Sequence, residues 1–344
     1  MSFMMREILD QPRALRRCYE AEHEHAIELK KFAERQDFRL ILLVARGTSD
    51  NAALFGRYLL ELTTGKPVSL CAPSVHTLYH AKLDLRKALV IGISQSGEGT
   101  DINAVLKAAR RQGAFTVGIT NEAKSTMAGL VDDAFFVRAG TQRSVAATKT
   151  YTGQLLMLYM LAAALGSHVT LERVSEIPKW VESSLELVPA IRQIVERYRF
   201  MRQCVVVARG LNYANAFELS LKLMETCYVV AERFSAADFL HGPIALVERD
   251  FPVMLFMPPG KTFAEMNRLA KRLRQLRAET VVISSSDSKL PAATRALRVP
   301  DVIPELYTPI PYIVPGQLVA ALLAEAKGID PDRPRSLKIV TRTR

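Results

Sequence analysis

Cysteine is scarce in this chain, and a long hydrophobic run is missing. Four cysteines are scattered over the 344 residues without CxxC pairing: Cys18, Cys71, Cys204 and Cys227. Disulfides and zinc sites usually need paired or closely spaced cysteines, so the sequence predicts reduced thiols in a cytoplasmic protein. The longest apolar run, residues 155–165, is well short of the ~20 residues that a membrane-spanning helix needs. We expect a buried helix there, no membrane anchor and no signal peptide.

Familiar nucleotide-binding loops are absent as well. The sequence has neither the GxxxxGK[ST] Walker loop nor the GxGxxG dinucleotide fingerprint. Five of the six histidines lie outside any recognisable motif, and we interpret them as structural or solvent-exposed: His23, His25, His76, His80 and His168. We therefore expect neither a metal ion nor an organic cofactor.

The chain carries an excess of positive charge, with a net charge of +11 and a pI near 9.6. Clustered basic residues supply the electrostatic part of nucleic-acid binding. Here they are spread over four runs, at 13–17, 107–111, 271–277 and 333–344. The middle two runs lie on amphipathic helix patterns, which are usually solvated faces. We expect no nucleic-acid partner, and a weaker use of the charge is the attraction of anionic substrates.

One segment occurs twice. LLVARGTSDNAALFGRYLLE at 42–61 returns as VVVARGLNYANAFELSLKLME at 205–225. In each copy, an apolar run of strand type ends in Ala-Arg-Gly and continues with the period of a helix. The first copy has hydroxyl residues at the turn, where the second has leucine and asparagine. We infer two similar halves with divided roles, an anion site in the first and other chemistry in the second.

Apolar runs of strand length alternate with helix-period segments in both halves. The runs are 39–45, 67–72, 87–93, 114–119 and 133–138, then 203–208, 229–234, 252–258, 279–285 and 296–299. This alternation indicates an α/β fold with parallel sheets covered on both faces. We predict two domains, residues 1–180 and 181–344. The proline-rich stretch 309–315 is interpreted as a turn before a final helix at 315–327.

Hydroxyl side chains gather at two strand-to-helix turns of the first half. Ser94, Gln95 and Ser96 follow the third strand, and Thr48 and Ser49 follow the first. Helix N-termini offer unpaired N–H groups and a partial positive charge, and hydroxyls add further donors. In open parallel sheets, ligands lie at the carboxyl ends of strands near the switch in strand order. Two such turns suit one phosphate monoester, although helix capping is the plain alternative for the hydroxyls.

Three motifs together resemble the sugar isomerase (SIS) domain family: SQSGEGTD at 94–101, ARGTSDNA at 45–52 and SVAATKTYTGQL at 144–155. The resemblance covers nearly the whole chain. It is greatest for the tandem-SIS isomerase half of glucosamine-6-phosphate synthase and the related amino-sugar-phosphate deaminases. It implies that each half is a five-stranded, flavodoxin-like sheet in a three-layer αβα sandwich, and that the protein is a homodimer with active sites near the subunit interface.

The resemblance also implies which residues bind the substrate. By motif, the ligands of the sugar phosphate are Thr48, Ser49, Ser94, Gln95 and Ser96, with Gly47 at the first turn, and the backbone at Val145 and Ala147 lies along the sugar. The synthase branch usually has threonine where this chain has Gly99. Thr100, beside it, is the candidate replacement.

Glu225 is the candidate general base, because LKLME resembles the base motif of the family. Lys222 lies three residues earlier and shares its helix face, so its ammonium would keep the carboxylate ionised and oriented. Moving a proton between C1 and C2 of an open-chain sugar needs one positioned base. Without the motif, an ordinary surface ion pair would be the interpretation of these two residues.

Two further candidates come from the second half. His241 is the first residue of HGPIAL and resembles the family histidine that opens the sugar ring. In relatives, this histidine comes from the neighbouring subunit. The near-neutral pKa of imidazole suits proton transfer to the ring oxygen. Relatives end in R-x-L-x-K, whose lysine approaches the sugar carbonyl. Here Ile339 occupies that position and Lys338 comes one residue early, so Lys338 is the candidate if the tail shifts by one residue.

These residues predict an enzyme that acts on phosphorylated amino sugars. About 38 residues precede the first strand, so we expect no glutaminase domain, and deamination of glucosamine 6-phosphate to fructose 6-phosphate and ammonia is the reaction that remains. Deglycation of a fructosamine phosphate would use the same base and phosphate site. Ammonia-dependent synthesis would need a partner that supplies ammonia. A sugar-phosphate sensor without turnover is the alternative outside enzymes, and the presence of Glu225, Lys222 and His241 favours catalysis.

Overall fold

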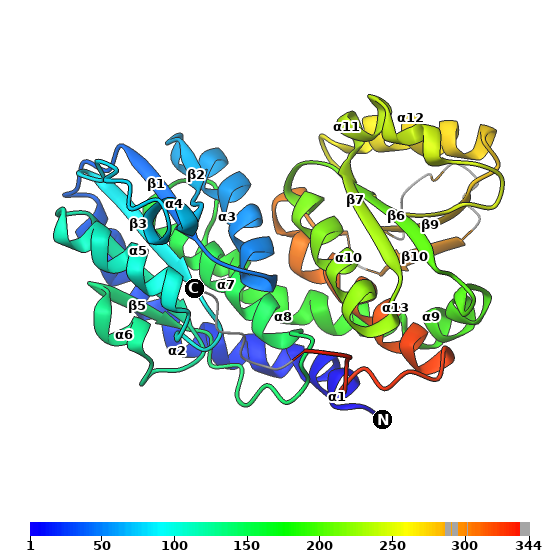
Figure 1. The fold of residues 1–344 in the computed structure, drawn as a ribbon, viewed down its shortest axis with the longest axis horizontal. Helices are drawn as coiled ribbons and strands as arrows, with labels where there is room; N and C mark the ends of the chain where they lie inside the picture. The colour runs from blue at the N-terminus through cyan, green and yellow to red at the C-terminus, as the bar shows by residue number, and fades with distance from the viewer. Residues whose placement is uncertain (286–289, 291–294, 301, 338–344) are drawn as a thin grey trace. The chain divides into compact units, whose positions relative to one another are not determined.

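Two five-stranded parallel sheets organise the chain (Figure 1). The computed structural model describes residues 1–285, 290, 295–300 and 302–337. The first sheet has the order β2-β1-β3-β4-β5 and the second β10-β9-β8-β6-β7. The strands are β1 (Leu40–Val44), β2 (Val68–Leu70), β3 (Ala88–Ile93), β4 (Phe115–Thr120), β5 (Asp133–Phe136), β6 (Gln203–Ala208), β7 (Val230–Ser235), β8 (Pro252–Phe256), β9 (Glu279–Ser285) and β10 (Arg295–Val299).

Both sheets have the same topology. If β6 is counted as a first strand, the second sheet also runs in the order 2-1-3-4-5 from one edge, and every paired neighbour is parallel. The repeated sequence segment is therefore a repeated structural unit: strand β1 with helix α3 (Thr48–Thr64) corresponds to β6 with α10 (Tyr213–Cys227). The predicted α/β fold with two parallel sheets is confirmed.

Helices cover both faces of the first sheet. Leu42 and Val90 pack with Leu106 of α5 (Thr100–Arg111) and Met127 of α6 (Thr126–Leu130) in one buried cluster. The opposite face is covered by α3 and α7 (Lys149–Leu165), which lie close because α3 has a glycine at the contact. A methyl group at Gly56 would lie 3.0 Å from a Leu158 methyl of α7. Burial of alternate strand residues on both faces explains why the strands are apolar throughout.

The second sheet is covered in the same way. Val205 and Val253 pack in a cluster with Leu269 and Leu273 of α12 (Phe263–Gln275) and with the short helix α11 (Ala236–Leu240). On the other face lie α10 and α13 (Pro309–Ala326), with α9 (Val188–Val195) beside α13. A methyl group at Gly316 of α13 would lie 3.3 Å from the Phe256 ring of β8. This face carries the candidate catalytic helix, α10.

The prediction of a turn at residues 309–315 is wrong, because α13 begins at Pro309. A proline in the first turn of a helix costs little, since the N–H that it lacks would have no partner inside the helix. Pro315 lies further along and is tolerated in a helix whose residues 309–324 are all buried. Tertiary packing therefore outweighs the local preference of proline for turns.

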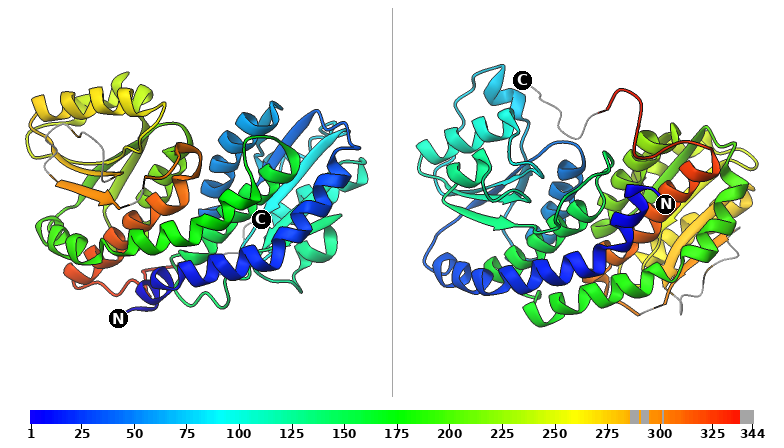
Figure 2. Two further views of the ribbon diagram at one scale, coloured as in Figure 1. Left: turned by 180° about the vertical axis from the view of Figure 1, so that it is seen from behind. Right: turned by 90° about the horizontal axis from the view of Figure 1, so that it is seen from below.

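The remaining helices lie at the N-terminus and in the connections: α1 (Phe3–Leu9), α2 (Gln11–Ala33), α4 (Pro73–Thr77) and α8 (Leu171–Leu185). Asp10 separates α1 from α2. Helix α2 runs along the first sheet, where Phe32 contacts Phe115 of β4 and His25 stacks on Phe135 of β5 (Figure 2).

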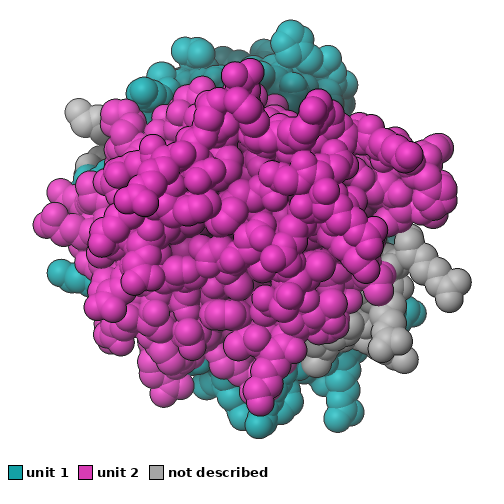
Figure 3. All heavy atoms as spheres, turned by 90° about the vertical axis from the view of Figure 1, so that its left-hand side faces the viewer, with its two compact units in different colours: residues 1–12, 143–148, 177–337 teal, residues 13–142, 149–176, 338–344 magenta. Residues whose placement is uncertain are grey.

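Contacts group the chain into two compact units, which Figure 3 shows in two colours. Unit 2 holds the first sheet, with residues 13–142 and 149–176, and unit 1 holds the second sheet, with residues 1–12, 143–148 and the described part of 177–337. Within the described residues, the chain passes from unit 2 to unit 1 for the last time between residues 176 and 177. The N-terminal residues and the short loop 143–148 nevertheless belong to unit 1.

Candidate active site

The two hydroxyl-bearing turns of unit 2 follow neighbouring strands. β1 leads into α3 and β3 into α5, and β1 pairs directly with β3. The chain goes from β1 to β2 on one side and then to β3 on the other, so the strand order switches between β1 and β3. In open α/β sheets this is the position where ligands bind, outside the carboxyl ends of the strands.

Gly47 makes the first turn possible. Its φ of 57° and ψ of −133° form a conformation that side chains strongly disfavour. Thr48 is then the first residue of α3, and Ser49 is buried with 8% of its surface exposed. The Ser49 hydroxyl accepts a hydrogen bond of 2.9 Å from the Gln154 amide of α7. A hydroxyl that accepts in this way still has its own hydrogen to donate.

The second turn is shaped by its own serines. Ser94 Oγ accepts a hydrogen bond of 3.1 Å from the Gly97 N–H, and Ser96 Oγ accepts one of 3.3 Å from the Glu98 N–H. Gly97 has a φ of 65°, and a methyl group there would lie 2.2 Å from Ser125 Oγ, so only glycine fits. Gln95 and Ser96 are partly exposed at the end of β3, and Thr100 is the first residue of α5.

The acidic residue of this turn is directed to a neighbouring helix. The Glu98 carboxylate accepts hydrogen bonds of 2.8 Å from the Thr126 N–H and 2.7 Å from its hydroxyl, at the start of α6. These two bonds lower the pKa of Glu98. The Glu98 carboxylate thus caps the N-terminus of α6. Because its charge is directed to that cap, it would repel an anion bound at the N-terminus of α5 less strongly.

An ion pair that the sequence did not indicate joins the two turns. Arg46 precedes Gly47, and its Nε lies 2.7 Å from Oδ2 of Asp101 in the first turn of α5. The Asp101 side chain is 1% exposed, whereas that of Arg46 is about half exposed. A buried carboxylate with a directed guanidinium partner fixes geometry, so the pair holds the starts of α3 and α5 in register.

In unit 1, the structure brings Lys222 and Glu225 together as predicted from their spacing. Lys222 Nζ lies 2.6 Å from Glu225 Oε2 on the same face of α10. The Lys222 side chain is fully buried, while 20% of the Glu225 side chain is exposed. The surface ion pair that would be the ordinary interpretation is therefore excluded, because the lysine has no contact with solvent.

Glu218 is a third member of this group, and sequence reasoning missed it. Its Oε1 lies 3.4 Å from Lys222 Nζ, and its side chain is fully buried. The signal was present as a spacing of four residues before Lys222 on one helix face. Burial by itself lowers the pKa of Lys222, but the charges of Glu218 and Glu225 outweigh it and hold that pKa above its usual value. Lys222 is thus a permanent cation beside Glu225.

The other candidates of unit 1 have varied surroundings. His241 is exposed and ends α11, where its N–H donates to the Asp238 carbonyl at 3.1 Å. Val145 and Ala147 are partly exposed, whereas the residues on either side of each are buried. Lys338 lies outside the described residues. The roles of all four residues stay predictions.

The cysteines take no part in these arrangements. Burial raises the pKa of the Cys71 thiol to about 11 and that of Cys204 to about 12, so both are protonated at neutral pH. Over the described ranges, no group of three or more His, Cys, Asp and Glu residues could hold a metal ion. α13 has the length and apolar composition of a membrane span, but 89% of that stretch is buried, as in the core helix of a globular protein.

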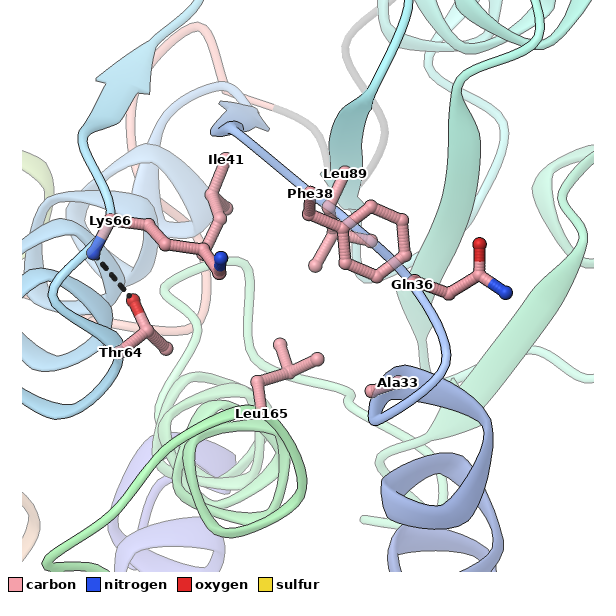
Figure 4. Close-up of a pocket in the computed structure, with 8 residues that line it drawn as sticks. All are labelled: Ala33, Gln36, Phe38, Ile41, Thr64, Lys66, Leu89 and Leu165. Carbon is pink, nitrogen blue, oxygen red and sulfur yellow. Dashed lines mark hydrogen bonds between the residues drawn. The ribbon is translucent and has the colours of Figure 1, made fainter.

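A small cavity lies at the amino ends of β1 and β3, opposite to the turns at their carboxyl ends (Figure 4). Its volume of about 30 Å³ holds one or two water molecules. Ile41 and Leu89 reach it from the starts of β1 and β3, and the Lys66 N–H donates to Thr64 Oγ1 at its rim. The cavity is too small for a sugar and lies away from the carboxyl ends of the strands.

Comparison with known proteins shows the class to which this protein belongs. The chain matches the SIS domain over residues 37–164 and 200–321, once in each half. A candidate phosphosugar isomerase of Silicibacter pomeroyi superimposes with a TM-score of 0.87 at 30% identity, covering 96% of this chain and all of the other. The C-terminal domain of glucosamine-fructose-6-phosphate aminotransferase of Francisella tularensis gives 0.87 at 25% identity, covering 97% and 98%.

Proteins of similar sequence show which kind of SIS protein this chain is related to. The glutamine–fructose-6-phosphate aminotransferase (isomerizing) of Pyrococcus horikoshii is 38% identical over 97% of this chain and 56% of its own length. That of Gloeobacter violaceus is 36% identical over 97% of this chain and 58% of its own length. The chain thus spans a little over half the length of these relatives. It belongs to the SIS domain family, as a tandem-SIS protein related to the isomerase half of these aminotransferases.

Proposed function

We propose that this protein is an amino-sugar-phosphate isomerase that releases ammonia, converting glucosamine 6-phosphate to fructose 6-phosphate. One observation carries the proposal. Glu225 is the exposed member of an otherwise buried group of two carboxylates around a fully buried lysine. Burying a lysine is costly unless a carboxylate pairs with it, and even a paired lysine adds little to the stability of the fold. Such a group is suited to keeping one carboxylate ionised and fixed for proton transfer.

The hydroxyls and N–H groups at the β1 and β3 turns would bind the phosphate. Thr48, Ser49, Ser94, Gln95, Ser96 and the candidate Thr100 are the proposed ligands. Their positions at the carboxyl ends of two adjacent strands support this role, because both helix N-termini there favour negative charge. Binding at the phosphate would hold the reacting carbons in place without taking part in the chemistry.

Glu225 would move the proton. In the open-chain aldehyde, its carboxylate takes the proton from C2, and the electron pair of that bond forms the C1–C2 double bond of an enolamine. The carbonyl electron pair moves to the C1 oxygen, which takes a proton from the 2-ammonium group. The same carboxyl returns the proton to C1, which leaves an imine at C2. Water adds to that imine, and ammonia departs to give the ketone of fructose 6-phosphate. One base serves both proton transfers, so the reaction needs no second carboxylate at the carbons.

His241 and Lys338 are assigned the remaining steps. An exposed histidine can pass a proton to the ring oxygen and so open the sugar, provided that it reaches the substrate. Lys338 would approach the sugar carbonyl. The relatives are glutamine–fructose-6-phosphate aminotransferases of the isomerizing kind, which supports a six-carbon sugar phosphate as substrate here.

The test is a panel of hexosamine 6-phosphates and fructosamine phosphates, followed by enzymatic assay of ammonia and of fructose 6-phosphate. We expect ammonia and fructose 6-phosphate in equal amounts from glucosamine 6-phosphate, and no release by Glu225→Gln. Release of an amino acid from a fructosamine phosphate would make the protein a deglycase. Product only when ammonia and fructose 6-phosphate are supplied would make it a synthase. Tight binding without turnover of any compound would make it a sensor.

A further inference from the structure

The short loop 143–148 lies between two segments of unit 2, yet it belongs to unit 1. Its burial alternates along the chain: Ser144, Ala146 and Thr148 are buried, while Val145 and Ala147 are partly exposed. The exposed pair are the residues whose backbone is proposed to lie along the sugar. Residues of unit 1 supply hydrogen bonds to the backbone of this loop.

The anchor at the start of the loop is a buried carboxylate of α1. Glu7 is 6% exposed, and its Oε1 accepts a hydrogen bond of 2.5 Å from the Arg143 N–H. Both of its oxygens lie 3.4 Å from the Ser144 N–H. The Arg143 guanidinium also lies 5.5 Å above the Phe3 ring of the same helix. Hydrogen bonds to an ionised acceptor are the strong ones, and a carboxylate is buried only where such donors are supplied.

The end of the loop is held by a relay of two buried glutamines. Gln11, at the start of α2, donates from Nε2 to Gln317 Oε1 of α13 at 2.9 Å. Gln317 Nε2 in turn lies 3.4 Å from the Thr148 carbonyl oxygen. Both glutamines are fully buried. The loop is thus fixed at both ends by groups that bond to its backbone.

The two hydroxyl side chains of the loop do not supply this anchoring. Ser144 Oγ and Thr148 Oγ1 are buried and make no hydrogen bond with any residue that the structure describes. Its conformation therefore depends on partners outside the loop, and Glu7 is the charged one among them. α1, which carries Glu7, is itself fixed at its N-terminus: the Asp332 carboxylate accepts from the Phe3 and Met4 N–H groups at 2.5 and 2.9 Å.

We propose that Glu7 is a positioning residue for substrate binding, which sets the backbone of loop 143–148 so that it fits the sugar moiety of a hexose phosphate. This inference rests on the proposed function. It assigns α1 a role in recognising the sugar, separate from the hydroxyl turns that bind the phosphate. Loss of the Glu7 carboxylate would loosen the loop and weaken the contacts with the sugar, while contacts with the phosphate would remain.

The test compares two ligands, glucosamine 6-phosphate and inorganic phosphate, by isothermal titration calorimetry. We expect Glu7→Ala to raise the dissociation constant for glucosamine 6-phosphate at least tenfold and that for inorganic phosphate less than twofold. Glu7→Gln keeps an acceptor oxygen for one N–H and should give an intermediate loss. In turnover, the loss should fall mainly on KM. Hydrogen exchange of the Arg143 and Ser144 amides should become faster in both variants.

Asp332→Asn is the matched control, because it weakens the other anchor of α1 without touching the loop. It should lower the melting temperature yet leave the ratio of the two dissociation constants within twofold of wild type. An unchanged ratio in Glu7→Ala and Glu7→Gln, with wild-type amide exchange, would overturn the role of Glu7. If the wild-type protein binds glucosamine 6-phosphate no better than inorganic phosphate, the proposed function fails instead.

Discussion

Lys222 is the residue on which the chemistry of α10 depends. It is fully buried between Glu218 and Glu225, and both carboxylates are close enough to share its charge. The three residues are spaced by four and three along one helix, so their arrangement needs no other element. Glu225, as the partly exposed member, is the one that can contact a ligand.

Replacing Lys222 by methionine should be severe for both activity and stability. Two carboxylates would lose the Lys222 ammonium, and one of them is fully buried, so we expect about 3–5 kcal/mol less unfolding free energy. Glu225 would lose the cation that holds its carboxylate in place, and kcat should fall at least a hundredfold. Urea denaturation and steady-state kinetics measure the two effects. Wild-type kcat in a folded Lys222→Met protein would contradict this account of the triad.

Ser96 offers a test of phosphate binding at the residue scale. A hydrogen bond to a charged group contributes about 1.5–3 kcal/mol, so Ser96→Ala should raise KM for glucosamine 6-phosphate roughly tenfold or more and change kcat little. Ser167→Ala is the control, since the Ser167 hydroxyl, just after α7, lies 3.4 Å from the Thr63 carbonyl near the end of α3. Equal KM values for the two variants would argue against a phosphate at the β3 turn.

At the scale of elements, the turn between β3 and α5 depends on one glycine. Gly97 and Gly113 both have a positive φ, but only Gly97 faces close neighbours. Alanine at either position bears the backbone strain, whereas alanine at Gly97 also collides with Ser125. We expect Gly97→Ala to lose about 1–3 kcal/mol more unfolding free energy than Gly113→Ala, and to raise KM. Chemical denaturation of the two variants measures these losses in unfolding free energy. Equal losses would show that the neighbours of Gly97 can move aside for a methyl group.

Helix α2 is joined to the edge strand β5 by a histidine. His25 Nε2 lies 2.7 Å from Asp133 Oδ1, Nδ1 lies 3.5 Å from Glu22, and Arg138 pairs with Glu22 from the other side. The hydrogen bond that His25 donates to Asp133, followed by the one it donates to Glu22, raises the pKa of His25 from 6.5 to about 9 against the effect of burial. At neutral pH the ring is therefore charged and pairs with Asp133.

This contact predicts a pH dependence of stability. Because the pKa of His25 is higher in the folded state than in the unfolded state, the protonated ring contributes its full stabilisation below pH 6.5. This contribution is lost as the pH rises toward 9. We expect about 1–2 kcal/mol to disappear over that interval. His25→Gln should flatten this part of the profile while the rest keeps its shape. An identical slope in wild type and variant between pH 6.5 and 9 would mean that His25 does not titrate in the folded protein.

At the scale of the whole molecule, the duplication is the feature that the sequence predicted best. Apolar runs and the repeated Ala-Arg-Gly turn indicated two similar sheets, because both signals are local. The same holds for Lys222 and Glu225, whose contact follows from helix geometry alone. The start of α13 was missed because proline has a strong local preference for turns, and burial of the helix overrides it.

Contacts between distant segments could not be predicted in this way. Arg46 meets Asp101 only because β1 pairs with β3, and the sequence pattern does not give strand order. Glu7 meets Arg143 across 136 residues, and neither position belongs to a motif that indicated the contact. The candidate phosphate-binding turns were predicted from their motifs, but finding the residues that fix their geometry needed the structure.

Proton transfer by Glu225 is the central claim, and deuterium exchange tests it most directly. Wild-type protein and Glu225→Gln would be incubated with glucosamine 6-phosphate in D2O, and the C2 hydrogen of substrate and the C1 hydrogens of product followed by proton NMR. The account predicts solvent deuterium at these carbons with the wild type, and exchange at least a hundredfold slower with the variant, since a general base contributes about 10²–10⁴ in rate. Exchange at the wild-type rate in Glu225→Gln would contradict it.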